Sequence, residues 1–579
     1  MKIEITMPEL NSTEKTVYEH IYPDLHDWPI YKFGQQRKEF IHQINQEILR
    51  DLSTLKDSEL DQILAKAIYA ERQRVKTNPW KADPPNQAIF FRKLLKEYHE
   101  NQISDENKKS KNLETAFRLV KRYSEEIAGN FNINTFQFVR KVSNAVFYVL
   151  LSKPKLLSLF SQKKMKAANL SRLKVLGNLE NIRALFPEHT IVLLPTHSSN
   201  LDSILVGYTI DLATGMPAFS YGAGLNLFDS EFFAFFMNRL GAYRVDRRKK
   251  NSIYLKTLGV FSKNSIKRGV NTIFFPGGTR SRSGEVEMKL KLGLLNSLIQ
   301  AQRELLEEND KRKVVIVPVV INYESVLEAR DLMIQHLKTT GQEKFTMRDK
   351  SPSIFEYVKF AKRLLTRESS VYLTFGDPID VFGNQLDKDA NSFNVHNQHI
   401  DLKDYFVHEG KIAIDTQRES IYTKELSECI VKQFRNYNLI LPCHIVAFAA
   451  FRLLAKMNPH QDMYNLVQIP EEEVVFGEKQ FRQYIIWIWT FLKKMKVSDK
   501  LKYINQIPDD MDELISEGLE TLGCFHNLKP LTRNKQGQLC SEDFITLLYY
   551  SNKLNNLFAD EEINWQEIHL DLDPQTKLT

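Results

Sequence analysis

The sequence has few cysteines, no long apolar run, and no apolar stretch among its first residues. Four cysteines occur in 579 residues, all toward the C-terminal end and none in CxxC spacing. This pattern excludes a disulfide or zinc framework and is typical of a reduced, cytoplasmic protein. No run approaches the roughly 18 apolar residues that a transmembrane helix needs. The first residues lack the apolar stretch of a signal peptide, so we expect a protein that stays in the cytoplasm.

Composition places the chain among ordinary globular proteins of several domains. Hydrophobic residues make up 42% and charged residues 26%, which is typical of soluble folds. The chain is too long for a single hydrophobic core. Its net charge of +7 is compatible with anionic ligands or an anionic membrane surface, but demonstrates neither.

Apolar periodicity divides the chain into four parts. Residues 1–170 show helical spacing, and residues 171–385 alternate between strand and helix patterns. Residues 386–425 form a polar linker or loop, and helical spacing returns over 426–579. Strands are predicted at 191–194, 271–275, 313–321 and 371–375. The fold class is therefore α/β, with a mostly parallel or mixed sheet between N- and C-terminal helical domains.

A histidine and an aspartate follow the first of these strands. His197 and Asp202 would diverge by roughly 140° on one helix. They meet only if His197 lies in a loop and Asp202 faces back from the first turn of a helix that begins near Ser198 or Ser199. A carboxylate in that position would orient the imidazole and stabilise its protonated form.

The same spacing also has an ordinary interpretation. It occurs twice more, at His396 with Asp401 and at His399 with Asp404, in a polar stretch with no strand before it. We interpret those two pairs as solvated loop. The spacing alone is weak, so its meaning depends on the other motifs.

A glycine- and arginine-rich stretch follows the second predicted strand, at residues 275–284. Gly277 and Gly278 allow close backbone approach to a ligand. Arg280 and Arg282 are two residues apart, so both would point to one side of an extended loop and suit a phosphate monoester. The alternative is a basic surface turn.

Three further features have two interpretations each. Arg247 belongs to a basic cluster at 241–248 that follows a helix predicted at 232–240, and is either an anion ligand or solvated surface. Pro318 interrupts an apolar strand, which predicts an edge strand or a bulge, for a cleft wall or simply for the core. The apolar segments 144–160 and 484–496 either contact lipid or pack inside the protein.

Taken together, these stretches resemble the glycerolipid acyltransferases, and among them the larger glycerol-3-phosphate and dihydroxyacetone-phosphate enzymes. His197 to Asp202 is similar to their His-x4-Asp block, residues 241–247 to the block that ends in arginine, 279–284 to the Gly-Thr-Arg-Ser block, and 316–319 to the proline block. The likeness extends to residues 223–227, 291–295, 322–328, 375–379 and 548–558. The residues it implies for substrate binding are Arg247, Gly278, Thr279, Arg280, Ser281, Arg282 and Pro318.

The resemblance implies transfer of a fatty acyl group to the sn-1 hydroxyl of glycerol 3-phosphate, the first step of phospholipid synthesis. His197, oriented by Asp202, would act as the base. The acyl donor would be acyl-CoA or acyl carrier protein. It implies no metal, cofactor or nucleic acid, and peripheral contact with the cytoplasmic face of a membrane.

The sequence departs from this pattern at one position. Gly277 stands where most members have glutamate. Loss of that carboxylate would lower activity, alter the acceptor, or be harmless. The alternatives are therefore lysophosphatidate or dihydroxyacetone phosphate as acceptor, or a non-catalytic lipid- or phosphate-binding relative.

Overall fold

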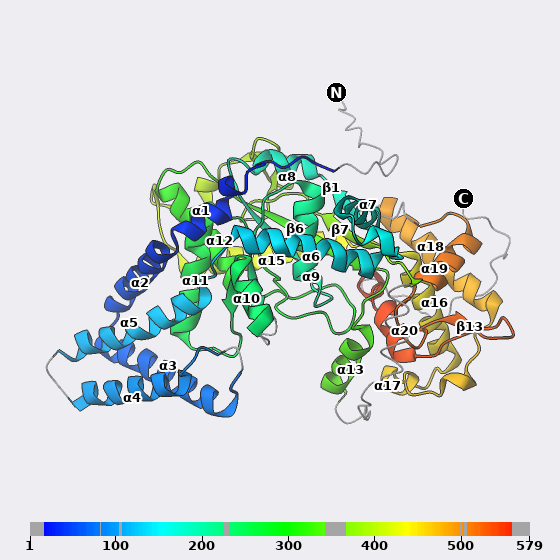
Figure 1. Cartoon of the computed structure of the whole chain (residues 1–579), viewed down its shortest axis with the longest axis horizontal. Coiled ribbons are helices and arrows are strands. Elements are labelled where there is room, and N and C mark those ends of the chain that lie inside the picture. The colour runs from blue at the N-terminus through cyan, green and yellow to red at the C-terminus, as the bar shows by residue number, and fades with distance from the viewer. Residues whose placement is uncertain are drawn as a thin grey trace.

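The structure is a computed structural model that describes residues 17–80, 83–103, 107–224, 231–341, 366–497, 501–502 and 507–558. A central seven-stranded sheet has helical parts on both sides, the N-terminal one at the left and the C-terminal one at the right of Figure 1. The strand order is β1-β7-β6-β2-β5-β3-β4. The strands are β1 (Leu173–Gly177), β2 (Thr190–Pro195), β3 (Ser220–Gly224), β4 (Ala242–Val245), β5 (Thr272–Ile273), β6 (Val314–Tyr323) and β7 (Val371–Phe375).

The sheet is parallel except where β6 meets β7, which confirms the predicted mixed α/β class. Strands β2 and β6 are buried along their whole length, as their continuous apolar sequence predicts for a sheet covered on both faces. Val192 and Leu194 face a core that includes α12 (Leu292–Glu307) and α15 (Thr416–Asn436). Ile191 and Leu193 face the opposite core, which continues into the C-terminal helices.

Pro318 lies in the interior of the sheet, so the prediction of an edge strand is wrong. It is opposite Leu194, and β6 lies between β7 and β2. Ile316 exchanges both backbone hydrogen bonds with Ile379, and the Pro318 carbonyl accepts the N–H of Gly376 at 2.8 Å. The alternation of a strand therefore turns the missing N–H toward the β7 side, where regular pairing has ended. The regular pairing of β6 with β7 ends at Val319, next to Pro318, so the strand is interrupted on its β7 side as the proline predicts.

The strands β1, β3 and β4 were not predicted. They are four or five residues long, and β1 and β3 each have two buried and three partly exposed residues at the outer parts of the sheet. Short strands of this kind give little periodic signal. In contrast, β5 is shorter than its predicted range, because pairing covers only Thr272 and Ile273.

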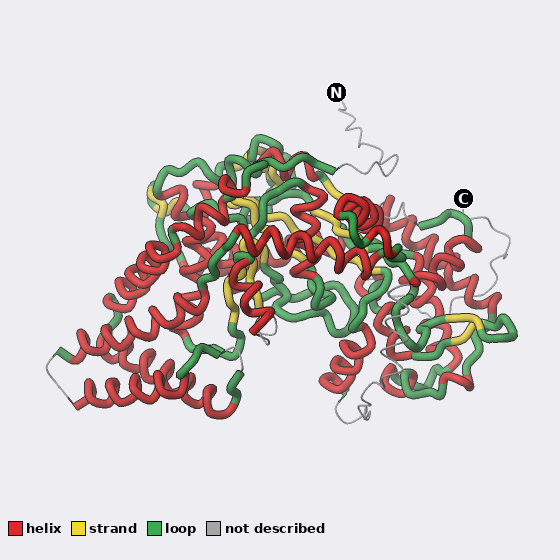
Figure 2. Tube along the Cα trace, in the orientation of Figure 1, coloured by secondary structure: helices red, strands yellow, loops and turns green. Residues whose placement is uncertain are grey.

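The described N-terminal part consists mostly of helices (red in Figure 2). The helices are α1 (Pro29–Gln35), α2 (Arg37–Ser53), α3 (Asp57–Thr77), α4 (Gln87–Ile103), α5 (Lys108–Ile127), α6 (Ile133–Leu151) and α7 (Gln162–Arg172). Helices α2 to α5 share one core with α11 (Ser252–Lys267) of the sheet region. Helix α6 instead packs on α7, and Phe147 of α6 stacks on Tyr208.

Residues 386–425, the predicted polar linker or loop, are folded into turns and short strands. They contain the short strands β8 (Gln385–Leu386), β9 (Ser392–Phe393), β10 (His399–Ile400), β11 (Val407–His408) and β12 (Lys411–Ile412), and α15 crosses the predicted boundary at 425. Asp387 and Asn394 each accept two backbone N–H groups through Oδ1, so polar side chains close turns here. His396 and His399 are exposed, as predicted.

The C-terminal helices pack around α16 (Pro442–Met457), most of which is buried. They include α18 (Glu478–Val497), α19 (Met511–Thr521) and α20 (Phe544–Ser551). Tyr484, Ile485 and Ile488 of α18 are fully buried, so the aromatic segment 484–496 is a core helix and the membrane interpretation of it is wrong. Over the described ranges, we find no helix with the length and apolar character to cross a membrane.

Candidate active site

His197 and Asp202 meet at the carboxyl end of β2. The chain leaves β2 at Pro195, turns, and enters α9 (Asp202–Thr209). His197 Nδ1 lies 2.7 Å from Asp202 Oδ2. The helix begins at Asp202 itself, several residues later than predicted. Neither Ser198 nor Ser199 caps it, because the N-cap position is Leu201. The N–H groups of the two serines donate to the Asp202 carboxylate at 2.7 and 2.8 Å and so hold the turn.

Asp202 is fully buried and its carboxylate is surrounded by donors. The hydroxyl of Tyr323, at the end of β6, donates to Oδ1, while Oδ2 takes the two backbone N–H groups and the histidine. A buried carboxylate needs such donors to stay ionised. Burial, followed by the neighbouring Asp202 charge, holds the pKa of Tyr323 well above its ordinary value, so the hydroxyl remains a donor. Asp202 is thus fixed as an acceptor for the imidazole.

The ring of His197 is held from several sides but is not sealed off. Its backbone N–H donates to Glu287 Oε1 at 2.6 Å, and its carbonyl accepts the N–H of Ser281 at 2.7 Å. The ring stacks on Phe275 with centroids 4.3 Å apart. The side chain is 19% exposed. Because Nδ1 is engaged with Asp202, Nε2 is the nitrogen left to exchange a proton.

The arginine-rich loop follows β5 and reaches the same edge of the sheet. Gly278 has φ +80, a left-handed conformation that glycine adopts without strain. Thr279 is exposed, and the Ser281 hydroxyl donates to the Glu285 carbonyl at 2.6 Å. The two arginines do not share one partner. Arg280 lies 3.6 Å from Glu328. The exposed Arg282 instead lies near α13 (Ala329–Thr340). Burial lowers the pKa of His336 on that helix, and the charge of Arg282 lowers it further.

Glu328 joins Arg280 to the histidine loop. Its carboxylate accepts the Ser199 hydroxyl at 2.9 Å and the Asn200 N–H at 3.0 Å. The guanidinium of Arg280 is therefore next to the loop that carries His197. Arg280 is about three-quarters buried. This contact places one predicted phosphate ligand beside the predicted base.

Arg247 and Pro318 are less close to His197. Arg247 follows β4 by two residues and is exposed. Strand β4 is three strands from β2, a lateral distance of roughly 14 Å. Pro318 is buried in the sheet opposite Leu194, below the level of the loops. Arg247 thus shares the edge of the sheet with His197, whereas Pro318 supports the strands under it.

The C-terminal helices add residues that the motifs did not indicate. Asn552 Nδ2 donates to the Ser283 carbonyl at 2.8 Å, and Asn556 Nδ2 to the Val286 carbonyl at 3.0 Å. Lys553 is buried, and burial lowers its pKa to about 8, although the charges of Glu287 and Asp202 raise it. The segment 548–558 had been noted only as a likeness to other sequences. Its spacing alone did not connect it with the arginine-rich loop.

A separate surface hollow lies in the C-terminal part and does not include these residues. Arg367, Arg482 and Arg533 line it. Arg482 is paired with Asp512 at 2.6 Å, and Arg533 with Glu478 at 3.0 Å. The paired arginines leave it a weaker candidate than the sheet edge. No group of three or more His, Cys, Asp or Glu side chains within the described ranges is arranged to hold a metal ion.

Comparison with known proteins finds similarity to acyltransferases in this part of the chain. Residues 174–322 match the family described as Acyltransferase. A glycerol-3-phosphate acyltransferase of Pseudomonas paraeruginosa is 27% identical over 267 residues, which cover 46% of this chain and 28% of that protein. One of Pseudomonas fluorescens is 26% identical over 295 residues, 51% of this chain and 30% of the relative. The chain thus spans less than a third of the length of these curated relatives, and the predicted resemblance is confirmed for its central part.

A solved structure adds a weaker likeness. It is the 1-acyl-sn-glycerophosphate (LPA) acyltransferase PlsC from Thermotoga maritima, at 15% identity, covering 42% of this chain and 88% of that chain. The TM-score is 0.19, which is too low to support any conclusion about the arrangement of the two folds. The class of the fold rests on the seven-stranded sheet described above.

Proposed function

We propose that this chain transfers a fatty acyl group from an acyl thioester to the sn-1 hydroxyl of glycerol 3-phosphate, as an early step of phospholipid synthesis. The observation that carries the proposal is the 2.7 Å contact between His197 and Asp202, next to a loop that Glu328 joins to Arg280. A base and a phosphate ligand side by side fit a phosphorylated alcohol as acceptor.

His197 would act as the general base. Its Nε2 accepts the proton of the acceptor hydroxyl while the oxygen attacks the thioester carbonyl. The ester bond forms, the carbon–sulfur bond breaks, and the thiolate takes up the proton that His197 carries. Asp202 stabilises the imidazolium through Nδ1–H. Base catalysis of this kind contributes about 10²–10⁴-fold.

The arginines would hold the phosphate, and so determine where the hydroxyl lies. Arg280 is nearest to the histidine loop, and Arg282 and Arg247 flank it at the same edge of the sheet. Orientation of the two reactants can remove roughly 7–11 kcal/mol of barrier. We therefore assign recognition first to Arg280, with Gly278, Thr279 and Ser281 shaping its loop.

A purified-protein assay tests the reaction. Labelled palmitoyl thioester, as CoA or acyl carrier protein, is offered with glycerol 3-phosphate, dihydroxyacetone phosphate or lysophosphatidate in turn. We expect transfer to glycerol 3-phosphate and its loss in His197→Ala, by about 10²-fold or more. His399→Ala is the matched control. This exposed histidine also has an aspartate five residues later, Asp404, but it lies in the loop region after β9 and not at the site. Full turnover in His197→Ala would reject the mechanism, and preference for another acceptor would change the substrate.

We further propose that the protein works at a membrane surface, with α6 as the contact. Phe138, Val142 and Val146 recur every four residues on α6 and are 54%, 42% and 44% exposed. Exposed lysines occur on α6 and in the residues that follow it, at positions 141, 153, 155, 163 and 164. An apolar stripe with basic neighbours favours the interface of anionic lipid.

Vesicle co-sedimentation tests the membrane proposal. Vesicles of phosphatidylglycerol and phosphatidylethanolamine should bind the wild type at low salt. The triple variant Phe138→Ser, Val142→Ser and Val146→Ser should bind several-fold less, because it lacks the apolar side chains that would enter the lipid interface. Val395→Ser, at a 94% exposed site in the β9–β10 turn, is the control. Equal binding of both variants would contradict α6 as the contact.

A further inference from the structure

The space next to Gly277 is already occupied by another side chain. A Cβ placed on Gly277 would lie 2.9 Å from Cγ of Glu287, 3.4 Å from its Oε1 and 3.5 Å from its carboxyl carbon. Contacts under 3.0 Å between carbon atoms are not tolerated without movement. A side chain at position 277 and Glu287 in its present position therefore exclude each other.

Glu287 uses that space to bind the histidine loop. Its Oε1 accepts the backbone N–H of His197 at 2.6 Å, a short bond of the kind that charged acceptors make. The loop between the two positions folds back on itself, since the Lys291 N–H donates to the Pro276 carbonyl at 2.8 Å. This return brings residue 287 under residue 277.

We propose that Glu287 is a positioning residue that supplies, from ten residues further along, the carboxylate that the chain lacks at Gly277. Its role is to hold the N–H of His197, while Ser281 holds the carbonyl, so that the imidazole stays directed between Asp202 and the acceptor. The glycine at 277 is then a requirement of this arrangement and not a lost function. The inference rests on the proposed acyl transfer for its kinetic readout.

The charges around Glu287 agree with this role. Lys553 from the C-terminal helices and Asp202 from α9 face it, in addition to His197. Burial raises the pKa of the Glu287 carboxyl to about 7, while the N–H of His197 and the charge of Lys553 lower it. Glu287 therefore changes its charge near neutral pH at a point that contacts the histidine loop.

A reciprocal swap tests the proposal. Glu287→Gly removes the acceptor and Gly277→Glu introduces a second side chain into filled space. Each single variant should lower kcat by about a hundred-fold, the cost of a small misplacement of a catalytic group. KM for the acceptor should change much less, because Arg280 is untouched. The double variant has one carboxylate in the same space and should recover most of the activity.

The conservative variant separates positioning from general structure. In Glu287→Gln the amide oxygen can still accept the N–H, so activity should remain, but the pH dependence near 7 that Glu287 causes should disappear. Met288→Ala, at the exposed neighbouring residue, is the matched control. A double variant no better than Glu287→Gly, or full activity in Glu287→Gly, would overturn the proposal.

A spectroscopic readout keeps the inference independent of the assay. In protein labelled with ¹⁵N-histidine, the backbone amide proton of His197 should resonate far downfield because of its short bond to Glu287. It should move upfield in Glu287→Gly and stay in Glu287→Gln. If the wild type transfers no acyl group but the amide shifts as stated, the proposed function fails and the positioning contact stands. An unchanged amide in Glu287→Gly refutes the contact itself.

Discussion

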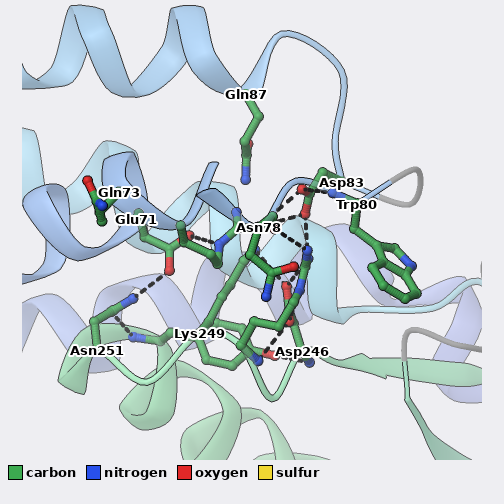
Figure 3. A network of polar contacts seen from close by, with 12 residues as sticks. Glu71, Gln73, Asn78, Trp80, Asp83, Gln87, Asp246, Lys249 and Asn251 are labelled. Atoms are coloured by element: carbon green, nitrogen blue, oxygen red, sulfur yellow. Dashed lines mark hydrogen bonds and ion pairs between the residues drawn. The ribbon is translucent and has the colours of Figure 1, made fainter. Parts of the chain in front are cut away.

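The N- and C-terminal helical parts both reach the loops at the carboxyl edge of the sheet, but they hold them by different chemistry. The N-terminal helices bind the loop after β4 through a network of buried charges (Figure 3). The C-terminal helices bind the arginine-rich loop through amide side chains and close backbone contact. One end of the site is therefore held mainly by ion pairs, and the other mainly by amide hydrogen bonds and close backbone packing.

The N-terminal network surrounds residues 246–251, a loop that includes Arg247. Arg248 bridges Asp83 at 2.6 Å and Asp246 at 2.8 Å, and Arg74 pairs with Asp83 at 3.0 Å. Lys249, whose side chain is fully buried, lies 2.6 Å from Glu126. Figure 3 shows Asn251 directed toward Glu71, with which it forms a hydrogen bond of 3.2 Å. Helices α3 and α5 thus fix the loop next to Arg247.

The C-terminal contact is closest at Gly284. This residue has φ +87, and a Cβ there would lie 2.2 Å from the carbonyl oxygen of Tyr549. Only glycine allows the loop and α20 to approach so closely. Asn552 and Asn556 then bind carbonyls on either side of it. Lys553 is the buried charge of this contact, and it interacts electrostatically with Glu287 and Asp202.

This difference predicts which substitutions weaken the N-terminal contact and which weaken the C-terminal contact. Removing one member of a buried ion pair leaves the other charge buried without a partner. This lowers the free energy of unfolding by far more than the pair contributes to it. Removing one neutral hydrogen bond costs about 1 kcal/mol. We therefore expect the N-terminal contact to fail through single charges, and the C-terminal contact to tolerate most single amides but to respond to pH at Lys553.

The largest effect is expected from Lys249→Met. It leaves Glu126 and Asp246 buried with one cation fewer, so the free energy of unfolding should fall by about 3–5 kcal/mol. Urea unfolding followed by circular dichroism measures it. Lys250→Met, at the exposed next residue, should change stability by less than about 0.5 kcal/mol. Equal stability of the two variants would show that the network does not hold the N-terminal part.

The next effect concerns pH at the C-terminal contact. Because the pKa of Lys553 is lowered to about 8 in the folded chain, the unfolded chain binds more protons between pH 8 and its ordinary pKa of 10.5. Stability should therefore rise with pH across this window, by up to roughly 3 kcal/mol. Lys553→Met should remove that rise, whereas Lys535→Met, at an exposed lysine, should keep it. Identical pH profiles for Lys553→Met and the wild type would contradict the burial of this charge.

The smallest effect is expected from Asn552→Ala. The variant loses the 2.8 Å bond to the Ser283 carbonyl, which should cost about 1 kcal/mol of unfolding free energy. Since Ser283 follows Arg282, KM for the phosphorylated acceptor should rise more than kcat falls. Gln536→Ala, on an exposed turn, serves as control. A loss as large as that of Lys249→Met would end the distinction between the two contacts.

The sequence was sufficient for the central strands and for the meeting of His197 with Asp202. Continuous burial of β2 and β6 follows from their apolar residues, and the turn before α9 follows from the divergence of the two side chains on a helix. These features depend on a few neighbouring residues. The short outer strands and the turns of 386–425 depend on their partners, and their own sequence did not identify them.

The site residues that were missed come from return loops and from distant segments. Glu287 lies in a stretch with no motif, and only the folded loop brings it under Gly277. Tyr323 was part of a resemblance without a role, and its bond to Asp202 depends on the register of β6 with β2. Arg280 and Arg282 were expected to converge, but Glu328 draws only Arg280 toward the histidine loop. Local spacing does not encode such partners.

The packing of Gly284 against Tyr549 has a consequence for the order of events during synthesis. The two segments are far apart in the chain, as are Asn552 and Ser283, which are 269 residues apart. A ribosome must translate almost the whole of this sequence before the second partner emerges, and contacts between such distant residues form slowly. We therefore expect nascent chains that end before α20 to carry an unbraced arginine-rich loop and to gain activity only after the last helices have folded.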